Sequence, residues 1–553
     1  MHVEKISYFL YNPLMNYTKT FLDKYKFEIL SFAFIFILIF AVYFHCSNFD
    51  FIHLDDTVLI QNKVQDMESI SSVKNLIFSS VFDGMRDKFY RPVLTITFLA
   101  DTLICGGEPG FYHYSNVLWH TFTAFLVFML FITMKYSKNT SFAAAAIFAV
   151  HPALVSAVAW IPGRNDILLA VFSILSFIFF IRQTENNKFS DIILSVLFFT
   201  LALFTKETAV MLPIIYILYT LLYGIKISKK NTLQTVISFS IALFLYAGFR
   251  HVVLSEGIQS ITLYEMIIKN MPTSFKATFW YFGVAGLTEK ILLYPHITNI
   301  SSVKILYPAA FTALLCVLLR KHCNFKHILF GIAWFIFFLL PTYVMPEKNF
   351  YTHRLYLPML GYFIIIFEIL RAFKKKYAVN INVFLIFLAL LITAMSLKSY
   401  KQTFYYKDRA SFWLQAIAEN PGSSKINAAI SVYYADTGDF DKAEQYALTA
   451  LKYAENTNIP RILVQSAEIY YRKNDMEKSK EYFRKAVEAD KFRESGYLGL
   501  SRVYENENNK EMSIKILEDA YEVIPQSKAI KKRLDNLKEG KKEFSYVISF
   551  KLK

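Results

Sequence analysis

Charged side chains are scarce in this chain of 553 residues, because Asp, Glu, Lys and Arg together make up only 19% of it. A soluble protein carries about 25%. Hydrophobic residues make up 55%, and they fill most of the sequence up to about residue 397 before they become sparse. The composition therefore excludes a wholly soluble protein and divides the chain into a membrane part and a soluble part.

Cysteine is also rare, and the four residues Cys46, Cys105, Cys316 and Cys323 show neither metal-ligand spacing nor a paired framework. We interpret them as small apolar residues. A cleavable signal peptide is not expected either. The first apolar stretch starts near Phe27 and is too long for the hydrophobic region of a signal peptide, so it should remain as an anchor.

A helix needs about 20 apolar residues to cross a bilayer, and eleven stretches of the sequence are candidates. The candidates are 27–47, 113–134, 142–160, 164–182, 189–204, 208–225, 233–250, 305–320, 327–345, 354–371 and 379–397. Another apolar segment, 272–288, is short and flanked by polar loops. We expect it to form a helix that lies at the membrane interface; a twelfth span is the alternative, which the pattern of basic loops disfavours.

Basic residues give the chain a formal net charge of +16, but they cluster between the apolar stretches, which argues for membrane topology rather than nucleic-acid binding. If the N-terminus with Lys19, Lys24 and Lys26 is cytoplasmic, eleven spans place alternate loops on that side, and each of these loops is basic. They contain Lys135/Lys138, Arg182/Lys188, Lys226/Lys229/Lys230, Arg320/Lys321/Lys326 and Arg371/Lys374/Lys375/Lys376. The loop 48–112 and everything after residue 397 then lie outside the cytoplasm, in the periplasm or a lumen.

Small residues recur in the C-terminal region with a period of about 34 residues, which is the length of a tetratricopeptide repeat. The recurring positions are Ala443, Ser479 and Ser513, and Ala450, Ala486 and Ala520. Small residues let paired helices pack closely, and stacked pairs form a concave groove. We predict a linker and capping helix at 398–424, about three repeats at 425–540 and a C-terminal tail at 541–553. A generic helical bundle is the alternative.

Two adjacent carboxylates, Asp55 and Asp56, lie in the outer loop shortly after the first span. Beside a membrane surface such a pair is a candidate general base or metal site, although an ordinary exposed acidic pair is the simpler alternative. Within the third span, His151 is ionisable and therefore a functional candidate. Its alternative is a packing residue hydrogen-bonded to a neighbouring helix.

Several cations fall at helix ends on the same outer face, against the usual bias of basic residues toward the cytoplasm. They are Arg91, Arg164, Lys206, Arg250 with His251, and Arg354, and Glu207 follows Lys206 directly. Each alone could be a helix-end residue whose charge reaches the membrane surface. Together, cations beside a bilayer suit a phosphate or pyrophosphate head group. With a carboxylate on the same side, they indicate group transfer from a lipid-linked phosphate donor.

Six sequence motifs occur in an order that resembles the transmembrane and tetratricopeptide-repeat O-mannosyltransferases and their bacterial relatives, which have the GT-C glycosyltransferase fold. The motifs are LDDTVLI at 54–60, YRPVLTITF at 90–98, GFYHYSNVLWH at 110–120, HPALVSAVAWIPGRNDIL at 151–168, FTKETAV at 204–210 and HRLYLPMLGY at 353–362. The resemblance implies an all-α protein. A GT-C-like membrane domain at 1–397, with about eleven transmembrane helices, would precede a tetratricopeptide-repeat α-solenoid.

The resemblance also implies roles for particular residues. The catalytic base would be Asp55 or Asp56, and the donor phosphate would lie against Arg164, Lys206 and Arg354. The supporting residues would be Arg91, His151, Glu207 and His353. A polyprenyl- or dolichyl-phosphate sugar would be the donor, and the repeats would bind the acceptor protein. Because phosphate is already a competent leaving group, no cofactor is obligatory, although a divalent cation bridging the Asp pair and the phosphate is an alternative.

Three positions depart from the family pattern. Leu154 and Ser156 stand where relatives often have His and Glu, and Thr352 stands where they tend to carry an acid. The substrate could therefore differ from theirs, or activity could be lost.

Because the Asp pair and the cations are kept, we predict an inverting glycosyltransferase that moves mannose or another hexose to an acceptor hydroxyl, on Ser or Thr of a protein. It would be a multi-pass protein of the bacterial inner membrane or the endoplasmic reticulum, with a cytoplasmic N-terminus and periplasmic or lumenal repeats. The alternatives are a GT-C enzyme that modifies a glycan or lipid, and a non-catalytic membrane scaffold.

Overall fold

The computed structural model describes residues 24–67, 70–81, 89–254, 263–287, 289–295, 304–343, 350–377 and 380–540. Lys19 and the predicted tail 541–553 lie outside these described residues. All regular structure within the described ranges is helical, as the sequence predicts. The chain divides into two compact units, Met1–Asp408 and Arg409–Lys553, which we call the membrane unit and the repeat unit.

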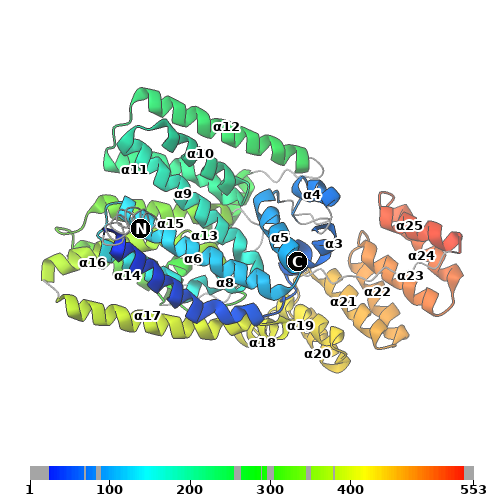
Figure 1. Ribbon diagram of the computed structural model, residues 1–553. Helices are drawn as coiled ribbons and strands as arrows, with labels where there is room; N and C mark the ends of the chain where they lie inside the picture. The colour runs from blue at the N-terminus through cyan, green and yellow to red at the C-terminus, as the bar shows by residue number, and fades with distance from the viewer. Residues whose placement is uncertain are drawn as a thin grey trace, which may run out of the picture. The chain divides into compact units, whose positions relative to one another are not determined.

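Among the described residues of the membrane unit, six helical segments are long and apolar enough to cross a bilayer, and a bent pair makes a seventh candidate (Figure 1). The six are Lys24–Asn48, α6 at Pro109–Thr133, Ile161–Asn186 with α9 at Arg164–Asn186, α12 at Lys229–Leu254, α15 at Phe325–Tyr343 and Asn382–Tyr406 with α17 at Ile381–Thr403. The other four predicted spans fall on α10 at Phe189–Leu203, α11 at Leu212–Tyr223, α14 at Tyr307–Leu318 and α16 at Met359–Tyr377. The protein is thus a multi-pass membrane protein. The number of eleven spans stays a prediction.

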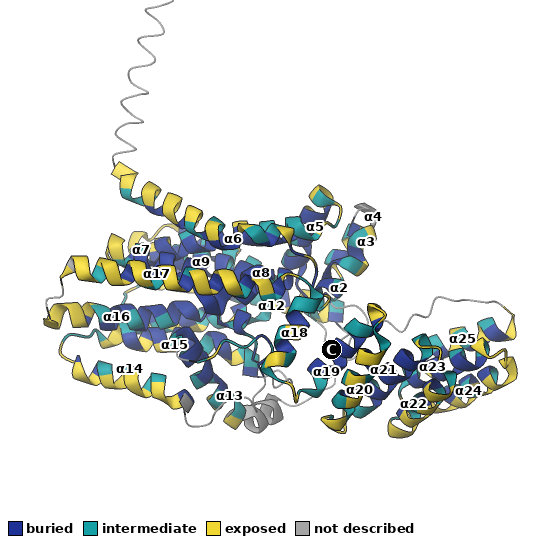
Figure 2. Cartoon of the chain, turned by 90° about the horizontal axis from the view of Figure 1, so that it is seen from below, coloured by how far each residue is buried: buried dark blue, intermediate teal, exposed yellow. Residues whose placement is uncertain are grey.

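Burial separates the inner helices of the membrane unit from the outer ones (Figure 2). In the most apolar 18-residue stretch of the segment that contains α9, 72% is buried inside the protein. The corresponding share is 17% in α12 and 22% in the segment that contains α17. An exposed apolar helix surface is what lipid contact requires, since lipid tails are as apolar as Leu.

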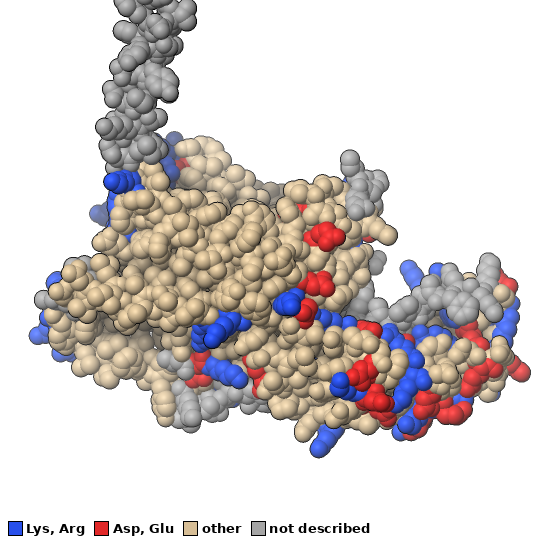
Figure 3. Space-filling model, turned by 60° about the horizontal axis from the view of Figure 1, so that its bottom comes forward, with Lys and Arg blue, Asp and Glu red and all other residues tan. Residues whose placement is uncertain are grey.

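The predicted cytoplasmic loops come together at one end of the membrane unit. The contacts that join them are Lys138–Glu28 (2.5 Å), Lys135–Glu185 (2.9 Å), Asn231–Asn187 (2.9 Å) and Arg371 to the carbonyl of His322 (2.9 Å). A wide uncharged surface covers the middle of this unit (Figure 3). This arrangement agrees with the positive-inside pattern. The direction in which the chain crosses the membrane stays a prediction.

The third predicted span is broken beside His151. There α7, Lys138–Ala149, meets the segment Pro152–Ala159 at 52°; this segment consists of η3, Pro152–Leu154, and α8, Val155–Ala159. Proline lacks an N–H and disfavours helical backbone in the residue before it. The Nδ1 atom of His151 accepts a hydrogen bond from the backbone N–H of Ala153 (3.2 Å), and Nε2 lies 3.1 Å from the carbonyl oxygen of Ala285. Both ring nitrogens therefore help to hold the break, which agrees with the alternative of a hydrogen-bonded packing residue, and a functional role of His151 stays a prediction.

In the segment predicted at the membrane interface, 272–288, residue 288 lies outside the described residues, and residues 272–285 belong to α13, Leu263–Ala285, which has Pro272 inside it. Its second half is buried within the membrane unit, where α13 packs against α15 and α16. Trp280 and Tyr281 are among the largest fully buried side chains. The expectation of a surface helix missed this burial, because apolar character alone does not separate lipid contact from protein contact.

In the repeat unit, a first helix precedes three helix pairs and a last helix. They are α18 at Arg409–Glu419, α19 at Ser424–Asp436, α20 at Phe440–Lys452, α21 at Ile459–Arg472, α22 at Met476–Ala489, α23 at Glu494–Asn506, α24 at Lys510–Val523 and α25 at Lys528–Lys538. All six small residues that set the period are buried.

The turn inside each pair has the same construction. A residue with positive φ (Gly438, Asn474 or Asn508) is followed by an N-cap (Asp439, Asp475 or Asn509) whose side chain accepts a backbone N–H three residues on. Gly and Asn tolerate left-handed backbone, and Asp and Asn are favoured N-caps.

Candidate active site

The two adjacent acids of the outer loop begin α2, Asp55–Leu59. Asp56 is only 1% exposed, and its Oδ2 accepts a hydrogen bond from the backbone N–H of Leu54 (3.4 Å). Burial, together with the neighbouring Asp55 carboxylate, raises the pKa of Asp56 to about 7. Asp55 is half-buried. One carboxyl group therefore carries a proton readily near neutral pH, and the other is more accessible.

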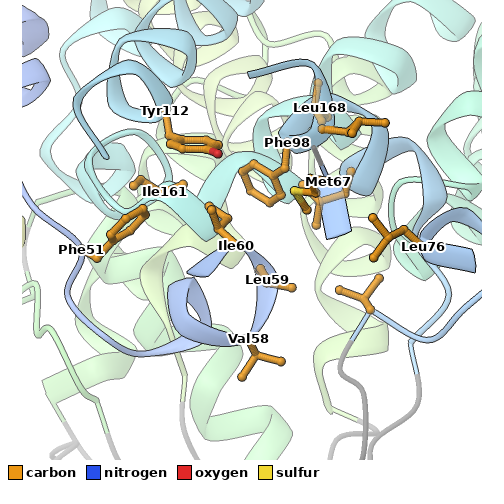
Figure 4. Packing of buried hydrophobic residues seen from close by; sticks show 13 residues of the cluster. Phe51, Val58, Leu59, Ile60, Met67, Leu76, Phe98, Tyr112, Ile161 and Leu168 are labelled. Carbon is orange, nitrogen blue, oxygen red and sulfur yellow. The ribbon is translucent and has the colours of Figure 1, made fainter. Parts of the chain in front are cut away.

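Apolar packing fixes the position of this acidic turn (Figure 4). Val58, Leu59 and Ile60 belong to one buried cluster with Phe98 of α5 and Ile161 of η4. Here α5 spans Pro92–Cys105 and η4 spans Ile161–Gly163. The cluster anchors α2 beside the start of α9, where two of the predicted site motifs meet.

Arg164 is fully buried, and the protein itself binds its guanidinium. Nη1 lies 2.5 Å from the Asp101 carboxylate, Nε donates to Oδ1 of Asn116 (2.7 Å), and Nη2 donates to the carbonyl of Tyr112 (2.9 Å). The guanidinium also lies over the Phe98 ring at 4.5 Å. Arg164 therefore ties α9 to α5 and α6, and the structure does not bring it to a ligand. No described contact supports its predicted role in binding the donor phosphate, which stays a prediction.

Lys206, by contrast, lies at the site with only part of its hydrogen-bonding capacity used. Its Nζ donates to Oδ1 of Asp166 (2.7 Å) and to Oδ1 of Asn165 (2.9 Å), and 14% of its side chain is exposed. Burial lowers its pKa, whereas the Asp166 carboxylate acts in the opposite direction. Asp166 and Asn165 follow Arg164 in the first turn of α9. The GRND motif therefore ties α9 to its neighbours through Arg164 and binds Lys206 through Asn165 and Asp166.

Arg91 and Glu207 form a second ion pair, with Arg91 Nη2 3.0 Å from Glu207 Oε2. Arg91 precedes α5, and Glu207 begins η5, Glu207–Met211. The Arg91 guanidinium also lies over the ring of Phe89, 4.5 Å from its centroid. The structure thus joins two residues that the sequence marked only as supporting.

His353 brings the third segment to the site on η8, Thr352–Leu355. Its ring lies 5.2 Å from that of Trp160 and is stacked 5.4 Å from that of Tyr351. Burial lowers its pKa well below the usual value, and the charges of Lys206 and Arg354 lower it further. His353 is therefore neutral.

Arg354, the next residue, is half-buried and lies over the Tyr351 ring at 5.5 Å. It interacts electrostatically with both Lys206 and His353, and Arg91 also acts on His353. Three predicted cations, from segments far apart in the sequence, therefore act electrostatically on one neutral histidine.

Two of the positions that depart from the family pattern lie against each other. The Ser156 and Thr352 hydroxyls are joined by a hydrogen bond of 2.8 Å, and both residues are buried. Two uncharged hydroxyls thus link α8 to η8 next to His353. The sequence marked the two departures separately, and the fold places them in contact.

Several buried polar atoms at the site have no hydrogen-bond partner among the described residues. They are Arg91 Nε, Asp166 Oδ2, Glu207 Oε1 and Trp160 Nε1. Buried polar atoms are nearly always paired in folded proteins, by protein or by ordered water. Three of these atoms belong to residues of the two ion pairs, Arg91–Glu207 and Lys206–Asp166. In the described part of the chain, no group of three or more His, Cys, Asp or Glu residues could hold a metal ion.

Comparison with known protein families matches residues 112–249 to the dolichyl-phosphate-mannose-protein mannosyltransferases. The tetratricopeptide repeat matches at 424–457, 460–492 and 495–527. These three matched ranges lie within the predicted repeat region 425–540 except for residue 424. The mannosyltransferase match contains Lys206, Asp166 and Glu207.

Among known proteins, protein O-mannosyl-transferase Tmtc1 of Drosophila melanogaster is 30% identical over 178 residues, which cover 31% of this chain and 20% of that protein. Protein O-mannosyl-transferase TMTC1 of Homo sapiens is 22% identical over 481 residues, covering 73% of this chain and 53% of the human protein. Protein O-mannosyl-transferase F38B6.6 of Caenorhabditis elegans is 24% identical, covering 74% and 61%. The chain thus spans from about one fifth to three fifths of these relatives.

The predicted resemblance to the transmembrane and tetratricopeptide-repeat O-mannosyltransferases is confirmed. A mannosyltransferase-family segment lies in the membrane unit, and three repeats follow it.

Proposed function

We propose that this protein is a membrane glycosyltransferase that transfers mannose, or another hexose, from a polyprenyl-phosphate donor to a hydroxyl group. The acceptor is Ser or Thr of a protein that the repeats bind. The reaction takes place at the end of the membrane unit opposite the basic loops, on the lumenal side of the endoplasmic reticulum or in the periplasm. The names of the relatives support the sugar and the acceptor class.

The observation that carries this proposal is the group of cations around His353. Lys206 and Arg354 act electrostatically on this neutral histidine, and so does Arg91. A half-buried set of cations at the membrane surface suits the phosphate of a lipid-linked donor, since charge-assisted hydrogen bonds to phosphate are strong. In our proposal Lys206 and Arg354 bind this phosphate, while Glu207 holds Arg91 in place beside it.

The acidic turn supplies the base. An Asp carboxylate takes the proton of the acceptor hydroxyl, whose oxygen forms a bond to the anomeric carbon. The bond from that carbon to the phosphate oxygen breaks, and the polyprenyl phosphate leaves with the electron pair. Attack from the side opposite the phosphate inverts the anomeric carbon. We assign the base role to Asp55, because it is the more accessible of the two acids.

A transfer assay with the purified full chain tests the proposal. The donor is polyprenyl-phosphate mannose carrying labelled mannose, and the acceptors are Ser/Thr peptides, lipid-linked glycans and polyprenols in parallel. We expect label on the peptides, and Asp55→Asn should reduce the rate by about 10²–10⁴-fold, the usual contribution of a general base. Asp66→Asn is the matched control, because Asp66 is an exposed acid of the same loop.

The outcomes separate the alternatives. Label on glycans or lipids alone would support the alternative, a GT-C enzyme that modifies a glycan or lipid. If the folded wild-type protein transfers no sugar to any acceptor, or if Asp55→Asn stays fully active, the proposed mechanism is refuted. Reporter fusions give a separate check, because the loop 48–112 and the repeats must lie on the same side of the membrane.

A further inference from the structure

A second group of polar atoms extends the site toward α12. The hydroxyl of Tyr246, on α12, is buried and has no hydrogen-bond partner among the described residues. The same holds for Glu207 Oε1, Asp166 Oδ2 and Arg91 Nε. Burial of an unpaired polar atom is unfavourable, and four such atoms in one neighbourhood call for a ligand that satisfies them.

Tyr246 belongs to this neighbourhood although α12 is a peripheral helix. Its ring packs edge-on against Phe204 at 5.6 Å, just before Lys206 in the chain. Glu207, Arg250 and Arg91 all interact electrostatically with it. Tyr246 is only 9% exposed, whereas most of the surrounding apolar side chains of α12 are exposed. This helix therefore places the Tyr246 hydroxyl in the protein interior, where the charges of Arg91 and Glu207 act on it.

The chemistry of the unpaired atoms distinguishes between possible ligand groups. Glu207 Oε1 and Asp166 Oδ2 are carboxylate oxygens that only accept hydrogen bonds, so their partners must be donors. A phosphate diester has no donors, and its charge would be repelled by these oxygens. A sugar hydroxyl both donates and accepts, which matches carboxylate oxygens, a phenol hydroxyl and an arginine N–H at once. The rings of Tyr90 and Phe204, 5.9 Å apart, add apolar surface for the faces of a sugar ring.

We propose that Tyr246, Glu207, Asp166 and Arg91 form the subsite that binds the hydroxyl groups of the transferred sugar. This inference rests on the proposed function and deepens it, since it separates two tasks within one site. Lys206 and Arg354 bind the donor phosphate, whereas the group next to α12 recognises the sugar. Tyr246 is then a specificity-determining residue.

Paired binding measurements on the purified full chain test this assignment. The two probes are polyprenyl-phosphate mannose and polyprenyl phosphate without sugar. Tyr246→Phe removes one hydroxyl and keeps the ring against Phe204. We expect it to weaken binding of the mannose-bearing probe about five- to tenfold, the effect of one hydrogen bond, and to leave the sugar-free probe within about twofold.

Tyr216→Phe is the matched control, because Tyr216 is also buried but its hydroxyl is already bonded to Ser176 (2.7 Å). It should leave both probes within about twofold. The sugar subsite is overturned if Tyr246→Phe leaves the mannose-bearing probe unchanged, or if it weakens both probes equally. If the wild-type protein binds neither probe, the proposed function itself fails, and that result is distinct from the other two.

Discussion

The buried acid Asp56 should make the stability of the protein depend on pH. Its pKa of about 7 in the folded state lies above the ordinary value of 3.8, mainly because of burial. A raised carboxyl pKa means that the folded state binds the proton more tightly than the unfolded state. This contribution to stability is therefore largest at low pH and is lost as the pH rises through about 7.

The size of the effect follows from the two pKa values. Between pH 7 and pH 5 the folded carboxyl group is protonated while the unfolded one stays ionised. Each pH unit is worth about 1.4 kcal/mol, and the folded group is half protonated at pH 7, so the wild-type protein should gain about 2.3 kcal/mol from this group. Asp56→Asn mimics the neutral form and keeps an oxygen that can accept the backbone N–H of Leu54. The variant should therefore be more stable than the wild type at pH 8, by up to about 4 kcal/mol.

Thermal unfolding of the detergent-solubilised full chain at pH 5 and pH 8 measures this difference. The advantage of Asp56→Asn over the wild type should be larger at pH 8 than at pH 5. Asp66→Asn, which alters an exposed acid of the same loop, should show no such change with pH. If Asp56→Asn and the wild type respond to pH in parallel, the burial argument for Asp56 is wrong.

Three further substitutions test separate parts of the structure. Lys206→Gln should raise the KM for polyprenyl-phosphate mannose by about tenfold or more, because it removes a cation from the phosphate site; an unchanged KM would contradict the assignment. Arg164→Met should destabilise the membrane unit by about 3–5 kcal/mol, because Asp101 is left as a buried unpaired charge, and adding Asp101→Asn should recover part of the loss in a thermal-unfolding assay. Gly499→Ala should destabilise the repeats by about 1–3 kcal/mol, since an ideal Cβ would lie 2.2 Å from the Phe483 ring; unchanged protease resistance of the repeats would refute this.

The repeat unit shows what local sequence determines well. A turn needs a residue that tolerates positive φ followed by an N-cap, and Gly438-Asp439 supplies both by residue type alone. Buried small residues at a fixed period specify how neighbouring helices pack. Because these signals are local and repeated three times, the sequence predicts the repeats without knowledge of tertiary contacts.

The site in the membrane unit could be predicted only in part. The sequence placed Lys206 and Arg354 on one face through charge and loop order, and their electrostatic interaction agrees with this. It could not separate Arg164 from these two, because the partner that neutralises Arg164, Asp101, lies on α5, far away in the sequence. Tyr246 was missed for a similar reason: in an apolar span, nothing local distinguishes a tyrosine that faces a polar site from one that faces lipid.

In the proposed site, the pairing of cations with acids would let one set of residues bind both phosphate and sugar. An isolated buried cation is unfavourable, so Lys206 and Arg91 need Asp166 and Glu207 when no donor is bound. These two ion pairs are neutral as a set, and Arg354 adds one positive charge, which matches the single negative charge of a phosphodiester. Each acid uses only one of its oxygens in its ion pair, and the second oxygen stays unpaired. The acids that keep the cations charged are thus also the acceptors to which sugar hydroxyls can donate, which is why a mutation of Glu207 should alter phosphate binding and sugar selectivity together.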